Sequence, residues 1–444
     1  MLVDEKQGGC ALDKLTKLEW KWILYDVGNS AFTLMVATVF PIYFNYLADM
    51  QGITSVDYLS YWGYAASIAT IVVALIGPVL GTISDAKGYK KPIFAAFIGI
   101  GVFGCAAMGL SRQWLLFLVI YVIAKIGFNS SLIFYDSMLS DVTTTERMDR
   151  VSASGFAWGY IGSCVPFVLS LALILGKDYI GISMMQAMLI AFVIVAVWWL
   201  VCSIPLLRSY KQIHYVEKHP YVVRESFRRL GNTFAHVREE KRVFLFLIAF
   251  FFYVDGVYTI IDMATAYGSA LGLDSTGLLL ALLATQLVAF PCSILFGRLS
   301  EKVDTVKLII VCIMAYFAIS VFAIFMAQQW QFWVLAVMVG MFQGGIQALS
   351  RSYFTKIIPA EKSGEYFGIM DICGKGASFM GTMAMSVVSQ LTGSVNAGVG
   401  IISVFFIIGI VFFLKSAREQ NNVIPMDKEI VEISFGRVME HGEH

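Results

Sequence analysis

Long apolar runs recur along the chain and are separated by short polar turns. Each run is long enough to cross the ~30 Å hydrocarbon core of a bilayer as a helix, which takes about 20 residues. The pattern therefore predicts an all-α membrane protein with twelve transmembrane helices. We place them at residues 21–47, 58–84, 91–110, 113–140, 151–176, 183–207, 242–270, 275–297, 307–326, 330–357, 365–390 and 396–415.

Polar segments divide the chain into five parts. We expect an N-terminal tail, a six-helix bundle, a central loop, a second six-helix bundle and a C-terminal tail, over residues 1–20, 21–207, 208–241, 242–415 and 416–444. Within the central loop an apolar stripe at helical spacing favours an interfacial helix on the membrane, although a helix packed under the bundle fits the same pattern. The stripe consists of Val223, Phe227, Leu230, Phe234 and Val237.

Basic residues gather in alternate turns, which sets the orientation. Cytoplasmic loops carry the excess of Lys and Arg, and the turns on the opposite side hold only Arg112 and Lys177. We therefore expect a multi-pass protein of the cell membrane with both termini in the cytoplasm. The basic residues in or beside the cytoplasmic turns are Lys87, Lys90, Lys91, Arg147, Arg150, Arg298, Lys302, Lys307, Lys356 and Lys362.

The sequence repeats itself. The segment from Gly81 to Lys87 recurs from Gly297 to Lys302, 216 residues later, and a second pair of matching turns is offset by 215 residues. Both copies occupy equivalent turns of the two sets of six spans. This indicates two six-helix repeats of the same orientation, related by an axis along the membrane normal.

Composition narrows the functional classes. The chain is 58% hydrophobic and 14% charged, whereas soluble domains are about a quarter charged. A net charge of +1 gives no indication of a nucleic-acid partner, and the seven cysteines are scattered singly, so we expect neither a zinc site nor a disulfide framework. We also expect no cofactor, no metal and no enzymatic activity, because no metal cluster or nucleophile–base pair is recognisable.

Several motifs carry a family resemblance. Gly81-Thr-Ile-Ser-Asp85-Ala-Lys-Gly-Tyr-Lys90-Lys91 resembles the signature of the major facilitator superfamily between its second and third helices. Segments 22–32, 134–147 and 344–352 are similar to its vacuole-effluxer-like branch, whose fungal members include an autophagy-related vacuolar amino-acid effluxer. The resemblance implies amino-acid efflux and a conformational-switch role for Gly81, Asp85, Lys90 and Lys91. The second copy lacks the glycine and basic pair after Lys302, a departure from the signature.

An ionisable residue within a membrane span costs free energy, so its presence indicates a functional role or a buried ion pair. Such residues fall on spans 1, 4, 7, 10 and 11, and in proteins that this chain resembles helices 1, 4, 7 and 10 line the central cavity. The distribution favours a polar central path. The bases are Lys125, Arg351 and Lys375, and the acids are Asp26, Asp136, Asp255, Asp262 and Asp371.

A substrate site is expected near mid-depth. A zwitterion such as an amino acid would place its carboxylate at Lys125 and its ammonium at Asp255. The alternative is that Lys125 pairs with an aspartate only to hold helices together. The full predicted site is Lys125, Asn129, Asp255, Gln343 and Gln347.

Two charge pairs are predicted nearer the cytoplasm. Asp136 and Arg351 are equivalent positions of the repeat, 215 residues apart, so a salt bridge between them would close an inner gate. A static strut and a substrate contact are the alternatives. Asp371 and Lys375 are spaced to pair along one helix.

The spans contain five acidic and three basic residues, so at least one aspartate is expected to lack a cationic partner. Burial favours the protonated form of such a carboxyl group. We therefore predict proton coupling through Asp26, Asp255 or Asp262, with Na⁺ as the other coupling ion considered.

Together these features predict a secondary active transporter, monomeric in the bilayer, that moves a small polar solute. A sensor or scaffold on a transporter fold is the alternative from a different class. A sugar, a nucleoside or another organic ion is the alternative substrate.

Overall fold

The computed structural model describes residues 14–53, 55–217, 226–228, 230–233, 239–270 and 275–439. These residues form helices without a β-strand, apart from one isolated bridge between Ala86 and Val216. The first set is α1 (Lys17–Ala37), α2 (Val39–Asp49), α3 (Ser55–Ser84), α4 (Lys90–Met108), α5 (Trp114–Ser137), α6 (Leu139–Val142), α7 (Met148–Leu175), α8 (Lys177–Ile180) and α9 (Met184–Ser209). The second set is α11 (Lys241–Ala270), α12 (Ser275–Leu299), α13 (Thr305–Ile324), α14 (Gln329–Ile357), the 3-10 turn η1 (Ala360–Lys362), α15 (Ser363–Thr392) and α16 (Val395–Met439).

Among the described residues, 10 helices are long and apolar enough to cross a membrane, and the bent pair α1 and α2 makes an eleventh span. The remaining long helix, α15, has 30 residues and carries Glu365, Asp371 and Lys375, which lower its hydropathy. With α15 the count reaches twelve, so the predicted all-α membrane fold is confirmed.

Two helices differ from the sequence prediction. The first span, expected as one helix over 21–47, bends by 41° between α1 and α2. The break lies one turn before Pro41 of α2, which has no N–H to bond to the Ala37 carbonyl and whose ring crowds that carbonyl. The Thr38 hydroxyl at the break donates to the Leu34 carbonyl at 2.6 Å. At the C-terminal end of the chain, α16 continues past Lys415 to Met439. Extending an existing helix adds one hydrogen bond per residue and avoids the cost of nucleating a new helix.

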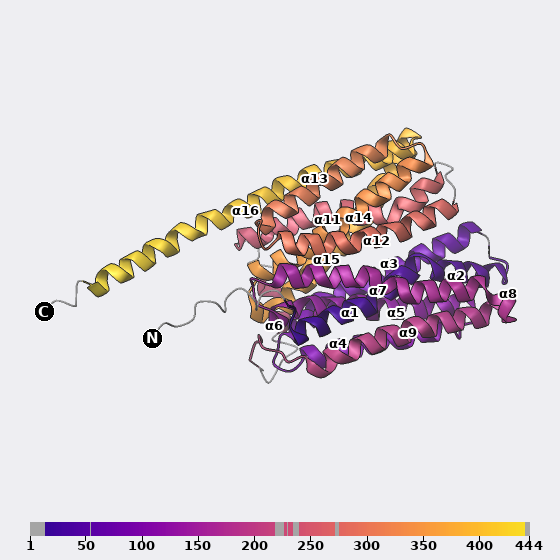
Figure 1. Ribbon diagram of the computed structural model, residues 1–444, viewed down its shortest axis with the longest axis horizontal. Coiled ribbons are helices and arrows are strands. Elements are labelled where there is room, and N and C mark those ends of the chain that lie inside the picture. Colours follow the sequence, from indigo (N-terminus) through magenta and orange to yellow (C-terminus); the bar gives the residue numbers. More distant parts are fainter. Residues whose placement is uncertain are drawn as a thin grey trace.

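The two sets of six pack in the same way (Figure 1). In the first half α1 contacts α7 and α9, α3 contacts α5, and α4 contacts α5 and α9. In the second half α11 contacts α15 and α16, α12 contacts α14, and α13 contacts α14 and α16. These are corresponding pairs in chain order, so the repeat seen in the sequence is also a repeat in packing.

Each half has its own apolar core. One cluster is drawn from α1 to α9 and the other mainly from α11 to α16. The halves meet where α3 packs against α15 and α7 against α12, which are again corresponding pairs.

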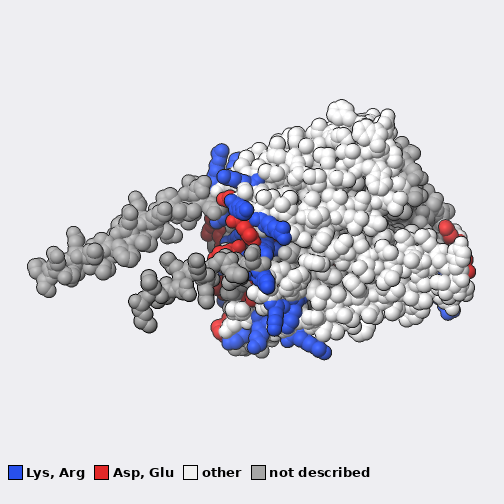
Figure 2. Space-filling model, viewed as in Figure 1, with Lys and Arg blue, Asp and Glu red and all other residues white. Residues whose placement is uncertain are grey.

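Charged side chains gather at one end of the bundle, and Figure 2 shows a long flank without charged side chains beside it. The helices of this flank are apolar. We call the end that carries the charges the charged end. Helices α1, α4, α7, α11, α13 and α15 begin there, and α3, α5, α9, α12 and α14 finish there. An apolar belt with charges beyond it is what a bilayer requires.

Parts of three predictions lie outside the described residues. They include Val223, Phe234 and Val237 of the central-loop stripe, and residues 1–13 of the expected tail. Of the remaining stripe residues, Leu230 is buried and Phe227 is exposed. Asp262 belongs to α11, but its side chain is also outside the description.

Candidate functional site

Arg351 of α14 reaches from the second half into the first. Its Nη1 donates to Oδ1 of Asp136 on α5 at 2.9 Å, and the same nitrogen lies 3.8 Å from Oδ2 of Asp26 on α1. Its Nε donates to the Ser152 hydroxyl on α7 at 2.9 Å, and Nη2 donates to the Ser152 carbonyl at 3.0 Å. We call these four residues the Arg351 cluster. It joins the halves through three helices of the first half.

Aromatic rings enclose the same guanidinium. Its central carbon lies 4.6 Å from the ring centroid of Trp22 and 4.4 Å from that of Phe156. A cation over an aromatic face is attracted by the ring, more strongly where water is excluded. Arg351 and Asp26 are buried. The planar, permanently charged guanidinium suits a forked, stacked site of this kind better than a lysine would.

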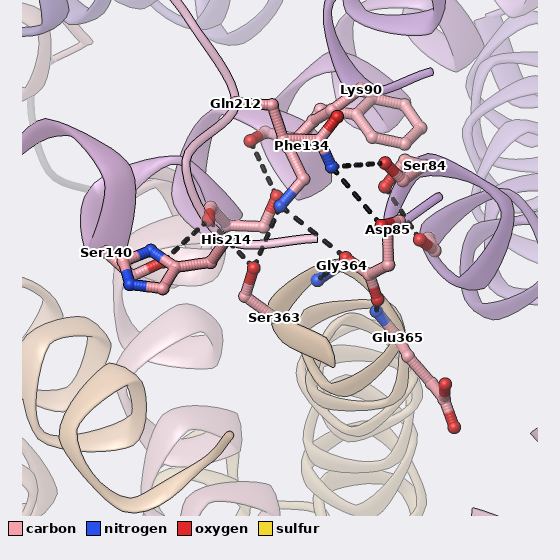
Figure 3. A network of polar contacts seen from close by, with 12 residues as sticks. Ser84, Asp85, Lys90, Phe134, Ser140, Gln212, His214, Ser363, Gly364 and Glu365 are labelled. Carbon is pink, nitrogen blue, oxygen red and sulfur yellow. Dashed lines mark hydrogen bonds and ion pairs between the residues drawn. The ribbon is translucent and has the colours of Figure 1, made fainter. Parts of the chain in front are cut away.

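A second contact between the halves forms at the turn after α3 (Figure 3). The Asp85 carboxylate accepts hydrogen bonds from the backbone N–H groups of Gly364 at 2.8 Å and Glu365 at 2.9 Å. These N–H groups belong to the first turn of α15, where the helix dipole favours negative charge. The Lys90 ammonium lies 3.5 Å from Asp85 and donates to the Ser363 hydroxyl at 2.9 Å. We call these five residues the Asp85 latch.

Of the four predicted switch residues, Asp85 and Lys90 are fully buried in the latch. Lys91, the next residue, is half-buried in the first turn of α4. Gly81 lies one turn before Asp85, where α3 crosses α15. A Cβ atom added to Gly81 would lie 2.1 Å from the carbonyl oxygen of Gly364, so the two backbones are in direct contact.

Gly81→Ala should therefore force α3 and α15 apart. Backbone cannot yield as a side chain does, and we expect a loss of about 1–3 kcal/mol, the usual range for overpacking. Gly99→Ala on α4 is the matched control, because a Cβ there meets nothing within 4 Å. Thermal unfolding of the purified proteins compares the two. Equal melting temperatures for the two variants would contradict the close crossing.

The second copy of the signature also meets the opposite half. Glu301, in the turn after α12, pairs with Arg150 of α7 at 3.0 Å. Beside it Asp149 accepts from the Lys356 ammonium at 2.6 Å and from the Thr305 hydroxyl at 2.5 Å. The second copy therefore also contacts the opposite half, through the start of α7. Sequence reasoning did not find this cluster.

The mid-depth lysine is held on its own helix. Lys125 donates to the Tyr121 hydroxyl at 3.1 Å. Lys375 pairs with Asp371 one turn away on α15, as the spacing predicted. The like charges of Lys375 and Lys125 repel one another, and so do those of Asp371 and Asp136. The charges of α5 and α15 therefore lie close together across the interface between the halves.

The polar stripe of α14 lies near the same interface. Gln343 is buried next to Tyr160 of α7, while Gln347 and Asn129 are half-buried. The Tyr160 hydroxyl is buried without a hydrogen-bond partner among the described residues. It adds a polar group from the first half that the sequence did not single out.

Asp255 has different surroundings from the other acids. It is fully buried on α11, and its Oδ1 accepts from the Gly381 N–H of α15 at 2.9 Å and from the Thr259 hydroxyl at 3.3 Å. Its Oδ2 has no hydrogen-bond partner in the described chain. The structure thus places Asp255 between α11 and α15 of the second half.

Glu19 is a buried acid that sequence reasoning also missed. It receives two hydrogen bonds from Arg147, at 2.9 and 2.8 Å, and closes a capping box with Thr16. Bonding to Glu19 raises the pKa of Arg147, so this pair stays ionised. The motif Thr16-Lys-Leu-Glu19 before an apolar run is a recognisable helix start, and it was the available signal.

No group of three or more His, Cys, Asp or Glu side chains that could hold a metal occurs in the described part of the chain. The candidate site is therefore a set of charged and polar side chains between two helical halves. Its contacts are concentrated at the charged end.

Sequence comparisons find relatives over almost the whole chain. The profile of the family described as "Vacuole effluxer Atg22 like" matches residues 16–144 and 140–423. The MFS-type transporter YxiO of Bacillus subtilis (strain 168) is 44% identical over 427 residues, covering 94% of this chain and 100% of the relative. Autophagy-related protein 22 of Yarrowia lipolytica is 25% identical over 306 residues, 61% of this chain and 51% of that protein.

Solved structures of similar fold are also transporters. The major facilitator superfamily transporter FucP in the outward conformation has a TM-score of 0.66 at 15% identity, covering 90% of this chain and 97% of that one. The proton:xylose symporter XylE has a TM-score of 0.65 at 10% identity, covering 90% and 94%. At these identities the likeness concerns the fold alone.

Proposed function

Because the chain belongs to the vacuole effluxer Atg22-like family and is a membrane transporter of the major facilitator type, we propose that it moves a small polar solute by alternating access. The solute is an amino acid or a related metabolite. The Arg351 cluster carries the proposal, since a side chain of one half is held by three helices of the other half near the charged end. Separation of these contacts opens the path to that end.

The charged end faces the cytoplasm in this proposal, with both termini inside and the protein in the cell membrane. The accumulation of Lys and Arg at that end supports the orientation. One chain supplies both halves, so a monomer suffices for transport.

The closed charged end depends on three sets of contacts between the halves. They are the Arg351 cluster, the Asp85 latch and the contacts at the start of α7, which pair Asp149 with Lys356 and Arg150 with Glu301. All three join groups of opposite charge or an anion to a helix N-terminus. Such contacts are strong where water is excluded, and water molecules take the place of the lost partner when the contact breaks. This suits a gate whose contacts must break and re-form in each transport cycle.

The proposed substrate site lies among Lys125, Asn129, Gln343 and Gln347, toward the middle of the bundle. The ammonium of Lys125 binds the substrate carboxylate, and the glutamine amides hydrogen-bond its polar groups. Asp255 is buried on α11, and in this proposal it acts on the coupling ion or the substrate ammonium once α15 moves.

Protons are the coupling ion in this proposal, and Asp255 is their carrier. Asp26 and Asp136 share Arg351, and Asp371 has Lys375. Of the four predicted aspartates whose side chains are described (Asp26, Asp136, Asp255 and Asp371), Asp255 is the one without an ion pair to a basic side chain. A buried carboxyl group in this situation favours its protonated form.

The substrate class is tested by thermal shift. Purified protein is screened against amino acids, peptides, sugars and nucleosides, and we expect an amino acid to raise the melting temperature. Lys125→Ala should abolish that shift because the carboxylate loses its cation. Lys177→Ala is the control, since Lys177 lies in the turn at the opposite end and pairs with Asp178.

A shift that survives Lys125→Ala would move the substrate site elsewhere. A stabilising sugar or nucleoside, with no effect of amino acids, would replace the proposed substrate class.

A further inference from the structure

Residues 210–217, which follow α9, lie across the turn between α3 and α4. We call this segment the strap. Its Val216 N–H donates to the Asp85 carbonyl at 2.8 Å, and its Val216 carbonyl accepts from the Lys87 N–H at 3.1 Å. The pair forms the isolated bridge between Ala86 and Val216.

Gln212 adds a second connection between strap and turn (Figure 3). Its side-chain Nε2 donates to the Ser84 carbonyl at 3.1 Å, and its Oε1 accepts from the Gly88 N–H at 3.0 Å. One amide side chain therefore bridges the last residue of α3 and Gly88 in the turn that follows it. The Lys87 ammonium also lies 4.6 Å above the Tyr215 ring.

The strap is anchored on the other side by Asp141 of α6, which is buried. Oδ2 of Asp141 accepts from the Tyr210 hydroxyl at 2.5 Å. Oδ1 accepts from the His214 N–H at 2.8 Å and lies 2.9 Å from Nδ1 of the same histidine. Burial and the nearby Asp141 carboxylate raise the pKa of the Tyr210 phenol well above its ordinary value, so this group stays a donor.

Asp85 is consequently held between two partners. Its backbone carbonyl bonds to the strap within the first half, and its carboxylate bonds to α15 of the second half. A turn that is already ordered can form the contact with α15 without a further loss of conformational entropy.

We propose that the strap positions Asp85 for the N-terminus of α15, and that Gln212 and Asp141 are positioning residues of the inner gate. The inference rests on the proposed alternating-access function. Without the strap the turn must be ordered each time the latch forms, so the closed charged end becomes less populated. The transport path itself is left intact, because neither residue lies among the mid-depth polar groups.

The test measures the population of the two states directly. Spin labels are placed at Lys17→Cys and Lys307→Cys, two exposed positions at the charged end, one in each half, in a variant whose seven native cysteines are replaced. Double electron–electron resonance then gives the ratio of short to long distances. Gln212→Ala should shift this ratio toward the open charged end by about five-fold, the expected effect of one or two lost hydrogen bonds.

Asp85→Asn supplies the decisive comparison. It removes the latch and should shift the ratio by itself. In that background Gln212→Ala should have no further effect, because the strap acts through Asp85. Asp141→Asn should shift the ratio in the same direction as Gln212→Ala. Gln51→Ala is the matched control, since its amide donates to the Arg112 carbonyl at 3.1 Å at the opposite end of the same half.

The outcomes separate this inference from the function on which it rests. A shift with Asp85→Asn but none with Gln212→Ala or Asp141→Asn would overturn the role of the strap alone. Equal effects of Gln212→Ala with and without Asp85 would show that the strap acts by another route. No shift with Asp85→Asn would overturn the latch and the strap together.

Discussion

Arg351→Ala should open the charged end and stop transport. The substitution leaves the buried carboxylate of Asp26 and the partly buried carboxylate of Asp136 without their cation. Removing one member of a buried ion pair costs about 3–5 kcal/mol. Since about 1.4 kcal/mol is a factor of ten in an equilibrium, the closed charged end should lose a factor of about 100 or more in population. Solute uptake into proteoliposomes and the spin-label distances described above measure the two effects.

Graded variants separate charge from geometry. Arg351→Lys keeps the positive charge, but it loses the fork that binds Ser152 and the stacking on Trp22 and Phe156. It should fall between the wild type and the alanine variant. Arg112→Ala, at the exposed opposite end, should transport normally.

The main rival is that the Arg351 cluster is a static strut. Neutralising the pair with Arg351→Met and Asp136→Asn distinguishes the two roles. A strut would regain both thermal stability and transport once the buried charges are gone. A gate would regain stability without transport, and wild-type transport by Arg351→Ala alone would exclude both the strut and the gate.

Asp255→Asn should abolish accumulation driven by a pH gradient while leaving solute exchange intact. Asparagine has nearly the same shape and keeps an acceptor for the Gly381 N–H, but it cannot take up a proton. The internal solute concentration should therefore fall from several-fold accumulation to that of the medium. Counterflow of labelled solute should continue, because exchange requires only the movement of the loaded carrier.

Asp178→Asn is the control, because this aspartate is exposed at the end opposite the gate. Undiminished pH-driven accumulation by Asp255→Asn would exclude Asp255 as the carrier. Asp262, the other predicted acid of α11, would then be the next candidate, and dependence on external sodium would point to Na⁺ coupling.

The helices and their order could be read from the sequence because a bilayer demands long apolar runs. The repeat offset then paired Asp136 with Arg351 as equivalent positions, and the structure brings those two side chains together. The bend at Thr38 was not predicted, although Pro41, one turn further along the chain, is a sequence signal for a break at this place.

The contacts that each charged side chain makes were harder to predict than its place along a helix. Ser152, Trp22 and Phe156 complete the site of Arg351 only because α1, α5 and α7 converge there. The placement of Asp255 against the Gly381 N–H likewise depends on how α11 packs on α15. Such contacts join residues more than a hundred positions apart, and no local pattern records them.

One measurement tests the account most directly. The protein is reconstituted into liposomes that contain a pH-sensitive dye, and single solutes from the amino-acid, sugar and nucleoside panel are added. We predict that an amino acid changes the internal pH in step with its own uptake, and that Asp255→Asn and Arg351→Ala both abolish the change. Folded wild-type protein that moves neither protons nor any solute of the panel would contradict the account.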